Sequence, residues 1–445
     1  MNFIKAFYLT KNTFILLGIC VGLFSFGLLH NLFFIMGKLL LLGLCVAVFI
    51  ETIVLFRVKQ PLLVSRKVPI RLSNGDTNAV TLFFENVTTL SFQLTIQEDF
   101  PEQFQLRNWK KITVSKAGEK TAYSYSIFPK TRGLYHWGDC HLLIQLFSYS
   151  LVAKKSTYHF EQSVACYPSF DQFNRIPLKT IVANFHDNTS NNLVRKIGQS
   201  LEFEQIKEYS REDDYRHINW KASAKRGQLM LNQYQEERSQ DIYCILDMGR
   251  SMKMPFYQQS LLDYAINASL ALSKTVISMQ DKAGIVGLSH DQCQFLPARK
   301  DFKQFGKIND FLYNIKTDYL EADYELLYKF ARVNIKQRSL LVIFTNFDSV
   351  NSLHRQMPYL KALSKYHLLL VVFFENAEVA QYVQEKAEDL KEIYSKTIAQ
   401  SLLNQHKLIC KELHKYSILS LLVQPQNLSM ETINKFVEIK RKNLI

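Results

Sequence analysis

Two uncharged apolar runs near the N-terminus, residues 13–29 and 39–50, define the first elements that the sequence predicts. With its flanking residues, each run reaches the roughly 20 apolar residues that a helix needs to cross a bilayer. The break between them, His30-Asn31, is short, so we expect an antiparallel transmembrane hairpin over residues 1–58. Lys38 lies near the start of the second span, where its long side chain can reach the membrane surface.

The cations that flank the two spans indicate their orientation. Lys5 and Lys11 precede the first span, Arg57, Lys59, Arg66 and Lys67 follow the second, and the turn carries no cation. Under the positive-inside rule, the chain is a multi-pass protein of the inner (cell) membrane, with both termini and the soluble domains in the cytoplasm. The alternative is a cleaved signal peptide, which requires a small-residue cleavage site and leaves the second span unexplained.

Residues 60–168 have the pattern of β-strands. Short runs rich in Val, Thr, Tyr, Phe and Ile, such as AVTLFFENV and SFQLTIQEDF, are separated by turn sequences such as SNGD and KAGEK. No run in this part of the sequence has helical periodicity, so we expect a small antiparallel β-sandwich. A polar stretch over residues 171–200 then predicts a linker or surface loop, within a connecting segment over residues 169–240.

From residue 241 to residue 445, apolar strands alternate with helix-length segments. The predicted strands cover residues 242–247, 283–289, 340–345, 367–374 and 417–423, and the predicted helices cover residues 257–279, 321–333, 352–365 and 377–413. Continuous apolar strands that alternate with helices predict a doubly wound α/β domain, in which a parallel sheet is covered on both faces. Residues 293–298 follow the second strand after a short turn and predict an edge hairpin. In such a domain the ligand site lies at the carboxyl ends of the strands.

Oxygen-bearing side chains follow two of these strands. The first strand ends in LDMGRSM, with Asp247 and Ser251, and the third is followed by Thr345, Asn346 and Asp348. Such oxygens are the ligands that Mg²⁺ prefers, so Asp247, Ser251 and Asn346 are candidate metal ligands. The alternative is that Asp247 and Ser251 cap the following helix.

A second group of polar residues lies in the sequence KEYSREDDYRHINWKASAK. Its candidate site residues are Glu208, Tyr209, Asp213, Asp214, Arg216 and Trp220. Paired carboxylates beside an arginine can do general acid–base work. They can equally form an ion-pair network that holds the segment in place, with Trp220 as a buried apolar anchor. No nucleophile accompanies them, which favours a structural or partner-binding role.

Composition and charge narrow the function further. Hydrophobic residues make up 47% and charged residues 21% of the 445 residues, which is typical of a folded protein. The formal net charge of +14 suits a protein beside an anionic lipid surface, and no nucleic-acid-binding motif accompanies it. The seven cysteines include no C-x-x-C pair, which argues against a zinc site or a disulfide framework. Phosphate-binding glycine loops and hydrolase or metalloprotease motifs are absent from the sequence.

The order of these features resembles a bacterial family called domain of unknown function 58, whose C-terminal part is a von Willebrand factor A-like domain. The residues that carry the resemblance are Glu208-Tyr209, Asp213-Asp214, Arg216, Ile218, Trp220, Ala224, Glu236-Glu237 and the TRGLYHWG run. The family's usual glycine before the acidic pair is Glu212 in this sequence, and its aspartate before the tryptophan is Asn219.

This sequence also departs from the family's metal-site pattern. A von Willebrand site resembles D-x-S-x-S, with a threonine and a second aspartate from other loops. In this sequence Gly249 replaces the first serine, Asn346 replaces the second aspartate, and no threonine near residues 318–323 fits. The resemblance therefore implies a degenerate site at Asp247, Ser251 and Asn346, with weak or absent Mg²⁺ binding and no other cofactor.

The resemblance implies a membrane-anchored, non-catalytic interaction module. Proteins like this are commonly associated with MoxR-type AAA+ ATPases and other von Willebrand A-like proteins, in the assembly or maturation of other envelope proteins. The expected partners are thus the lipid bilayer, such an ATPase and such proteins, and not nucleic acid. The alternative is an enzyme of unknown hydrolytic activity that uses Asp213, Asp214 and Arg216.

Overall fold

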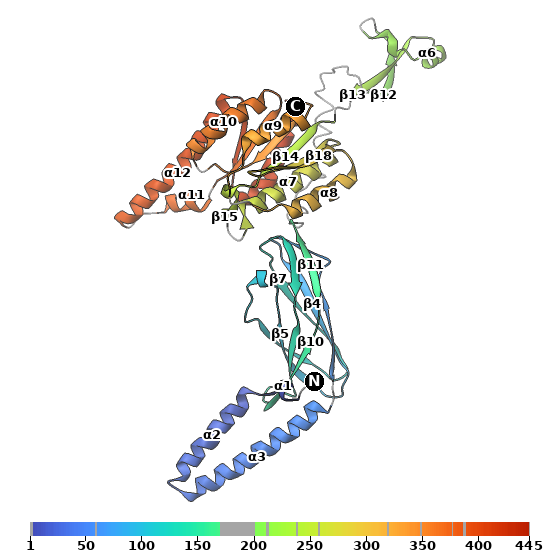
Figure 1. Cartoon of the computed structure of the whole chain (residues 1–445). Helices are drawn as coiled ribbons and strands as arrows, with labels where there is room; N and C mark the ends of the chain where they lie inside the picture. Colours follow the sequence, from blue (N-terminus) through green and yellow to red (C-terminus); the bar gives the residue numbers. More distant parts are fainter. Residues whose placement is uncertain are drawn as a thin grey trace. The chain divides into compact units, whose positions relative to one another are not determined.

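The chain folds into two compact units, Met1–Ser169 and Phe170–Ile445. A computed structural model describes residues 3–57, 60–169, 201–210, 213–236, 239–256, 259–317, 320–347, 349–375, 377–385 and 389–444 (Figure 1). The predicted linker over residues 171–200 lies outside the described residues.

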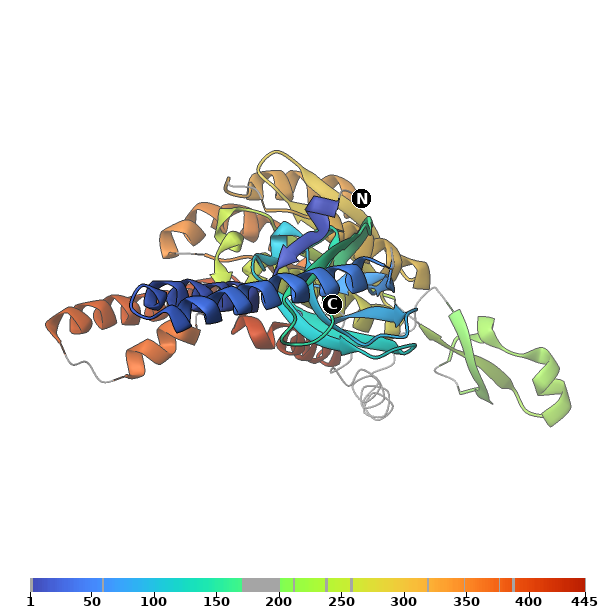
Figure 2. The ribbon, with the colours of Figure 1, turned by 90° about the horizontal axis from the view of Figure 1, so that it is seen from below.

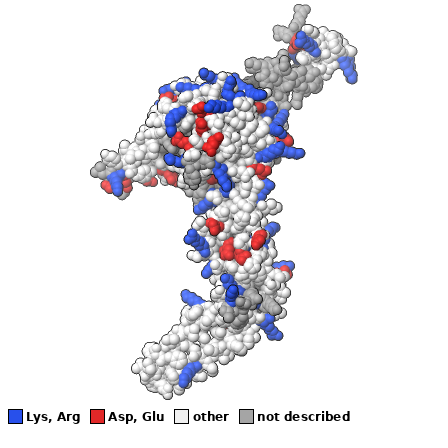
Figure 3. Space-filling view, viewed as in Figure 1, with Lys and Arg blue, Asp and Glu red and all other residues white. Residues whose placement is uncertain are grey.

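The first unit begins with two apolar helices, α2 (Lys11–Gly27) and α3 (Asn31–Phe56), which follow α1 (Phe3–Ala6) and β1 (Phe7–Leu9). The helices α2 and α3 lie side by side in both views (Figures 1 and 2). The rings of Phe24 on α2 and Phe34 on α3 pack edge to face, with their centroids 5.7 Å apart. Their surface is almost uncharged (Figure 3). Among the described helices, α3 is long and apolar enough to cross a membrane, and α2 is a shorter apolar helix.

The rest of the first unit consists of strands, as the sequence predicts, and one short 3-10 helix, η1 (Glu102–Phe104). The strands are β2 (Leu62–Lys67), β3 (Arg71–Ser73), β4 (Asn78–Asn86), β5 (Phe92–Glu98), β6 (Lys110–Ser115), β7 (Lys120–Ile127), β8 (Gly133–Trp137), β9 (Cys140–Gln145), β10 (Val152–Tyr158) and β11 (Gln162–Tyr167). The sheets have the orders β1-β10-β9-β5-β6, β2-β4-β7 and β3-β11-β8, and their apolar side chains share one core.

Two features of these sheets differ from the prediction. First, β3 pairs with β11 in parallel, although the sequence predicts an antiparallel sandwich. Pro69 lies in the break between β2 and β3, and because proline lacks a backbone N–H it interrupts a strand, so the chain leaves β4 and joins another sheet. Second, β1 precedes the helices and pairs with β10, which makes the N-terminus part of the strand-rich body.

The second unit contains a six-stranded sheet with the order β18-β17-β14-β19-β20-β21. Its strands are β14 (Asp241–Asp247), β17 (Lys282–Leu288), β18 (Cys293–Arg299), β19 (Leu340–Phe344), β20 (Leu368–Phe374) and β21 (Leu419–Val423). All neighbouring strands pair in parallel except β17 and β18, which form the predicted edge hairpin.

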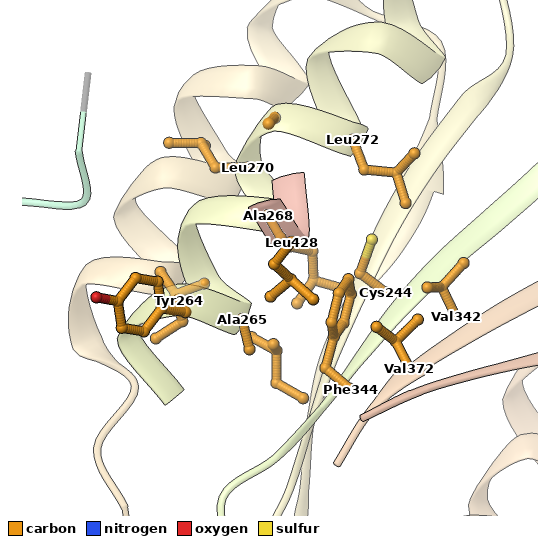
Figure 4. Close-up of a cluster of buried hydrophobic side chains, with 14 of the residues drawn as sticks. Cys244, Tyr264, Ala265, Ala268, Leu270, Leu272, Val342, Phe344, Val372 and Leu428 are labelled. Atoms are coloured by element: carbon orange, nitrogen blue, oxygen red, sulfur yellow. The ribbon is translucent and has the colours of Figure 1, made fainter. Parts of the chain in front are cut away.

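Helices cover both faces of this sheet. They are α7 (Leu261–Ser278), α8 (Phe302–Asn314), α9 (Tyr324–Asn334), α10 (Val350–Ser364), α11 (Ala377–Gln384), α12 (Leu390–Lys415) and α13 (Leu428–Arg441). Successive residues of β14 enter opposite cores, because side chains alternate along a strand: Cys244 packs with α7 and α13 (Figure 4), whereas Tyr243 and Ile245 pack on the side of α9, α10 and α12. The sequence did not predict α8 or α13, and the helix predicted over residues 377–413 is the pair α11 and α12.

Candidate functional site

The strand order of the second unit places one candidate site at the carboxyl ends of β14 and β19. The chain proceeds from β14 outward to β17 and β18 on one side, then returns to β19, β20 and β21 on the other. At such a reversal point the connections leave in opposite directions, and a crevice forms outside the strand ends. Asp247 ends β14, and Thr345 directly follows β19.

Asp247 is 4% exposed, and donors from this chain surround its carboxylate. The backbone N–H of Gly249 donates to Oδ1 at 2.8 Å. The Thr345 hydroxyl donates to Oδ2 at 2.6 Å, and the Tyr324 hydroxyl lies 3.3 Å from the same oxygen. Tyr324 also lies within hydrogen-bond distance of the Thr345 hydroxyl, at 2.9 Å. Asp247 therefore ties the end of β14 to the end of β19 and to the start of α9.

The electrostatics of this cluster follow from its burial. Desolvation raises the pKa of Asp247, and the hydrogen bonds from Thr345, Gly249 and Tyr324 oppose that rise. Desolvation also raises the pKa of Tyr324 well above its usual value, and the neighbouring Asp247 carboxylate adds to the shift. Tyr324 consequently stays protonated at neutral pH and remains a hydrogen-bond donor.

Gly249 allows a second loop to approach this cluster closely. A Cβ atom at residue 249 would lie 2.9 Å from the Ala322 nitrogen, 2.9 Å from Asp247 Oδ1 and 3.2 Å from the Leu320 carbonyl oxygen. The Arg250 N–H donates to that same carbonyl at 2.9 Å. A serine at residue 249, as in the D-x-S-x-S pattern, therefore has no room while the loop at residues 320–322 holds this position.

The structure places the other two predicted metal ligands differently. None of the described hydrogen bonds to Asp247 comes from Ser251 or Asn346. Asn346 lines a separate cavity of ≈ 170 Å³ with Phe374, Glu375 and His406, and its buried Oδ1 has no hydrogen-bond partner among the described residues. Asp348, the further candidate, lies outside the described residues.

These residues do not fit Mg²⁺. The ion requires near-ideal octahedral oxygen ligands, whereas the groups on the Asp247 carboxylate are N–H and O–H donors. Within the described ranges, no group of three or more His, Cys, Asp or Glu side chains could hold a metal. Tyr324 is not predicted from the sequence, because the residue expected in this loop is a threonine. The hydroxyl of Thr345 was recognised only as one of several oxygens after β19.

The second candidate site lies on β12 (Leu201–Glu208) and β13 (Met230–Glu236), an antiparallel pair that includes Glu208. The Tyr209 N–H continues this pairing by donating to the Leu229 carbonyl at 2.9 Å. Between the strands lie η2 (Tyr215–His217) and α6 (Trp220–Arg226). The segment is therefore an elaborated turn between two strands.

The paired carboxylates Asp213 and Asp214 both have local partners. Asp213 accepts from Lys207 Nζ at 2.7 Å, from the Ser210 N–H at 3.0 Å and from the Ser210 hydroxyl at 2.8 Å. The hydrogen bond from Lys207 is the main reason that the pKa of Asp213 falls to about 2. Asp214 caps η2 by accepting from the Arg216 N–H at 3.0 Å. A carboxylate with so low a pKa is a poor proton donor or acceptor near neutral pH.

The predicted burial of Trp220 is wrong, because its side chain is 71% exposed. Trp220 is the first residue of α6, directly after the capping residue Asn219, whose side chain accepts from the Ala222 N–H at 2.9 Å. The cap fixes where the helix begins, and the seven-residue helix that follows has no buried side chain. Tyr215 and Arg216 are also exposed, so this segment presents aromatic and cationic groups to its surroundings.

A third feature is an apolar surface on α11 and α12, which we call the α11–α12 surface. Figures 1 and 2 show the two helices as a pair that extends from the α/β domain. Its exposed large side chains are Tyr382, Ile393, Tyr394, Ile398, Leu402 and Leu408. A shallow hollow of ≈ 620 Å³ lies between the helices, bounded by Val383 on α11 and by Ile393, Thr397 and Leu408 on α12. Exposed apolar patches of this kind commonly mark interaction sites.

The elements define the class of this protein: a chain with apolar N-terminal helices, a strand-rich unit and an α/β domain. The model of the family described as "Protein of unknown function DUF58" matches residues 205–380, which include both candidate sites. This match confirms, over residues 205–380, the resemblance to the DUF58 family that the sequence shows.

Other comparisons add little. No curated protein matches the chain. The CARDB domain of a Pyrococcus furiosus protein is 12% identical, with a TM-score of 0.16 and coverage of 24% of this chain and 94% of that one. A PapD-like domain of human CEP192 is 14% identical, with a TM-score of 0.18 and coverage of 24% and 89%. A β-glucosidase from Listeria innocua is 12% identical, with a TM-score of 0.13 and coverage of 24% and 16%. At such TM-scores these likenesses carry no argument.

Proposed function

We propose that this chain is a membrane-anchored, non-catalytic interaction module whose cytoplasmic α/β domain works with a MoxR-type AAA+ ATPase in the assembly or maturation of other envelope proteins. The observation that carries the interaction role is the α11–α12 surface, where exposed aliphatic and aromatic side chains gather on two adjoining helices. The identity of the partner follows from the family resemblance.

The fold of the α/β domain supports this proposal. Counted along the chain, the strands of the sheet have the order 3-2-1-4-5-6, with an antiparallel strand at one edge. This order and the Asp247 strand end favour a von Willebrand factor A-like domain, whose usual role is to bind other proteins. Because internal donors occupy the Asp247 carboxylate, we propose that this domain binds its partner without a bridging cation.

The membrane anchor in this proposal is the pair of α2 and α3. At about 1.5 Å per residue, the 26 residues of α3 extend about 39 Å, which exceeds the roughly 30 Å hydrocarbon core of a bilayer. Large apolar side chains on both helices are exposed, including Phe14 and Ile19 on α2 and Leu42 and Phe49 on α3. A bilayer would cover this surface, and under the positive-inside rule the flanking cations favour a cytoplasmic location for both ends of the pair.

The local bonding of Asp213 and Asp214 gives no support to the alternative of a hydrolytic enzyme. Asp213 is held by Lys207 and Ser210, and Asp214 caps a helical turn. Hydrolase activity of the full-length protein that disappears in Asp214→Asn, with the melting temperature unchanged, would overturn the non-catalytic assignment.

The direct test of the interaction role is binding of the full-length protein in nanodiscs to a purified MoxR-type ATPase from the same organism. Ile398→Asp should weaken binding by about tenfold or more, because a hot-spot residue near the centre of an interface contributes about 2 kcal/mol or more. Ile398 is exposed on α12, so this substitution should not disturb folding. The matched control is Phe302→Asp, an exposed apolar residue on α8, which should bind normally. No binding by the wild type, or equal binding by Ile398→Asp, would contradict the proposal.

A further inference from the structure

The start of α2 is bonded to the loop that joins β9 and β10. The Thr10 hydroxyl donates to the Ser150 carbonyl at 2.6 Å, and the Thr13 hydroxyl donates to the Leu151 carbonyl. Asn12 Nδ2 donates to the Ser148 carbonyl at 3.3 Å. Both threonines are buried, although they lie where a nearly uncharged helix begins. The first turn of α2 is therefore fixed against this loop.

The end of α3 is bonded to the same loop and to β10. Glu51 Oε2 accepts from the Leu151 N–H at 2.8 Å and from the Val152 N–H at 2.9 Å. Lys154 Nζ donates to the Leu55 carbonyl at 3.4 Å, where a cation is favourable because helix C-termini carry partial negative charge. Burial lowers the pKa of Lys154. Both helices are thus joined to the strand-rich body through one short stretch, residues 148–154.

The outer part of this loop exposes two aromatic side chains. Phe147 is 56% and Tyr149 is 84% exposed, whereas Ser150 and Leu151 are buried beneath them. The loop is a bonded turn, because the Ser150 N–H donates to the Phe147 carbonyl at 3.1 Å and the Phe147 N–H donates to the Ser150 hydroxyl at 3.2 Å. Because the backbone is held in this way, the two aromatic groups belong to a fixed surface.

The position of Glu51 sets the level of this loop along the helices. Residues 31–50 of α3 number 20 and, at about 1.5 Å per residue, extend about 30 Å, the thickness of the hydrocarbon core. Glu51 is the next residue, and Lys11 is the charged residue that begins α2. The loop bonded to Glu51 and to Thr13 therefore lies where the helices leave the bilayer. Aromatic side chains are enriched at this depth, because their rings are amphipathic.

We propose that the β9–β10 loop docks onto the headgroup region of the bilayer that α2 and α3 cross, with Phe147 and Tyr149 as interfacial anchors. This inference rests on the proposed membrane placement of the two helices. Phe14 and Ile15 in the first turns of α2 are also exposed, and the hydrogen bond from Asn12 to the Ser148 carbonyl joins this part of the helix to the loop, so one lipid surface can cover both. The loop and the helix ends together hold the strand-rich unit at a fixed tilt to the membrane.

The test is photo-crosslinking of the full-length protein in phosphatidylglycerol-containing nanodiscs, with p-benzoylphenylalanine introduced at one residue at a time. Tyr149→p-benzoylphenylalanine should give phospholipid adducts, detected as a mass increase of the peptide that contains residue 149. Phe49, exposed on α3, is the positive control, and the exposed apolar residue Ile70 is the matched negative control. Ile70 precedes β3, which pairs with the C-terminal half of β11, so the full length of β10 separates it from the loop.

The expected result is lipid adduct at residue 149 at about the yield of residue 49 and about tenfold above residue 70, as the interfacial preference of aromatic residues implies. Adducts at residue 49 with none at residue 149 would overturn this inference and leave the membrane anchor intact. Absence of adducts at residue 49 would overturn the membrane placement itself. Crosslinks from residue 149 to a second copy of the chain, in place of lipid, would also contradict lipid docking.

Discussion

Substitution of Thr345 tests whether internal hydrogen bonds hold the Asp247 site together. Thr345→Val keeps the side-chain shape but removes the hydroxyl that donates to Asp247 Oδ2 at 2.6 Å. A buried hydrogen bond to a charged group contributes about 1.5–3 kcal/mol. The Tyr324 hydroxyl, 3.3 Å from the same oxygen, can compensate in part once Thr345 no longer competes for it. We therefore expect a loss of about 2 kcal/mol, which for a domain of this size lowers the melting temperature by about 4–8 °C.

The assay is thermal unfolding of the full-length protein in detergent, with hydrogen exchange of the β14 and β19 peptides to locate the change. Thr345→Ser keeps the hydroxyl and is the matched control, which should melt close to the wild type. Addition of a chelator should leave the melting temperature of the wild type unchanged. Wild-type melting and exchange in Thr345→Val would refute the hydrogen-bonded site, and so would a chelator-induced drop in the wild type.

Three further predictions concern the two candidate sites. Calorimetric titration of the full-length protein with Mg²⁺ should show no micromolar binding, and micromolar affinity lost in Asp247→Ala would contradict the account. Burial raises the pKa of Asp247 above 3.8, so the folded state binds its proton more readily than the unfolded state does. As pH rises from about 3.8 through the raised pKa, the wild type should therefore lose melting temperature relative to Asp247→Asn, and parallel curves would be inconsistent with a raised pKa. Trp220→Ala should change the free energy of unfolding by no more than about 0.5 kcal/mol, because the side chain is exposed, and a loss of several kcal/mol would mean that it is buried.

The strands of the α/β domain are predictable because they are short, continuous and apolar. β14 and β20 are buried on both faces, so their sequences contain few polar residues and contrast with the helices around them. The sequence does not predict α8, because Gly306 and the many polar residues of this helix weaken its apolar pattern. Ile308 and Leu312 are its main buried apolar residues. The split between α11 and α12 was missed because both helices have a similar mixed composition.

The sites were harder to predict because they depend on tertiary contacts. The sequence predicts Asp247 as a site residue at the end of a strand. It does not predict the partner Tyr324, which lies 77 positions later in the chain and begins another helix. The sequence pattern indicates a lost ligand at Gly249, whereas the close approach of the loop at residues 320–322 requires a residue without a side chain. The residue type predicts that Trp220 is buried, although the short, capped helix α6 leaves it exposed.

We propose that α2 and α3 cross a membrane and leave the α/β domain in the cytoplasm, where an ATP-dependent partner can reach it. The most direct measurement uses fusions to a reporter enzyme that is active only outside the cytoplasm. Fusion near Asn31, in the turn between the helices, should give activity, and fusion after Lys59 should give none. Activity after Lys59 would place the α/β domain outside the cytoplasm and contradict the account.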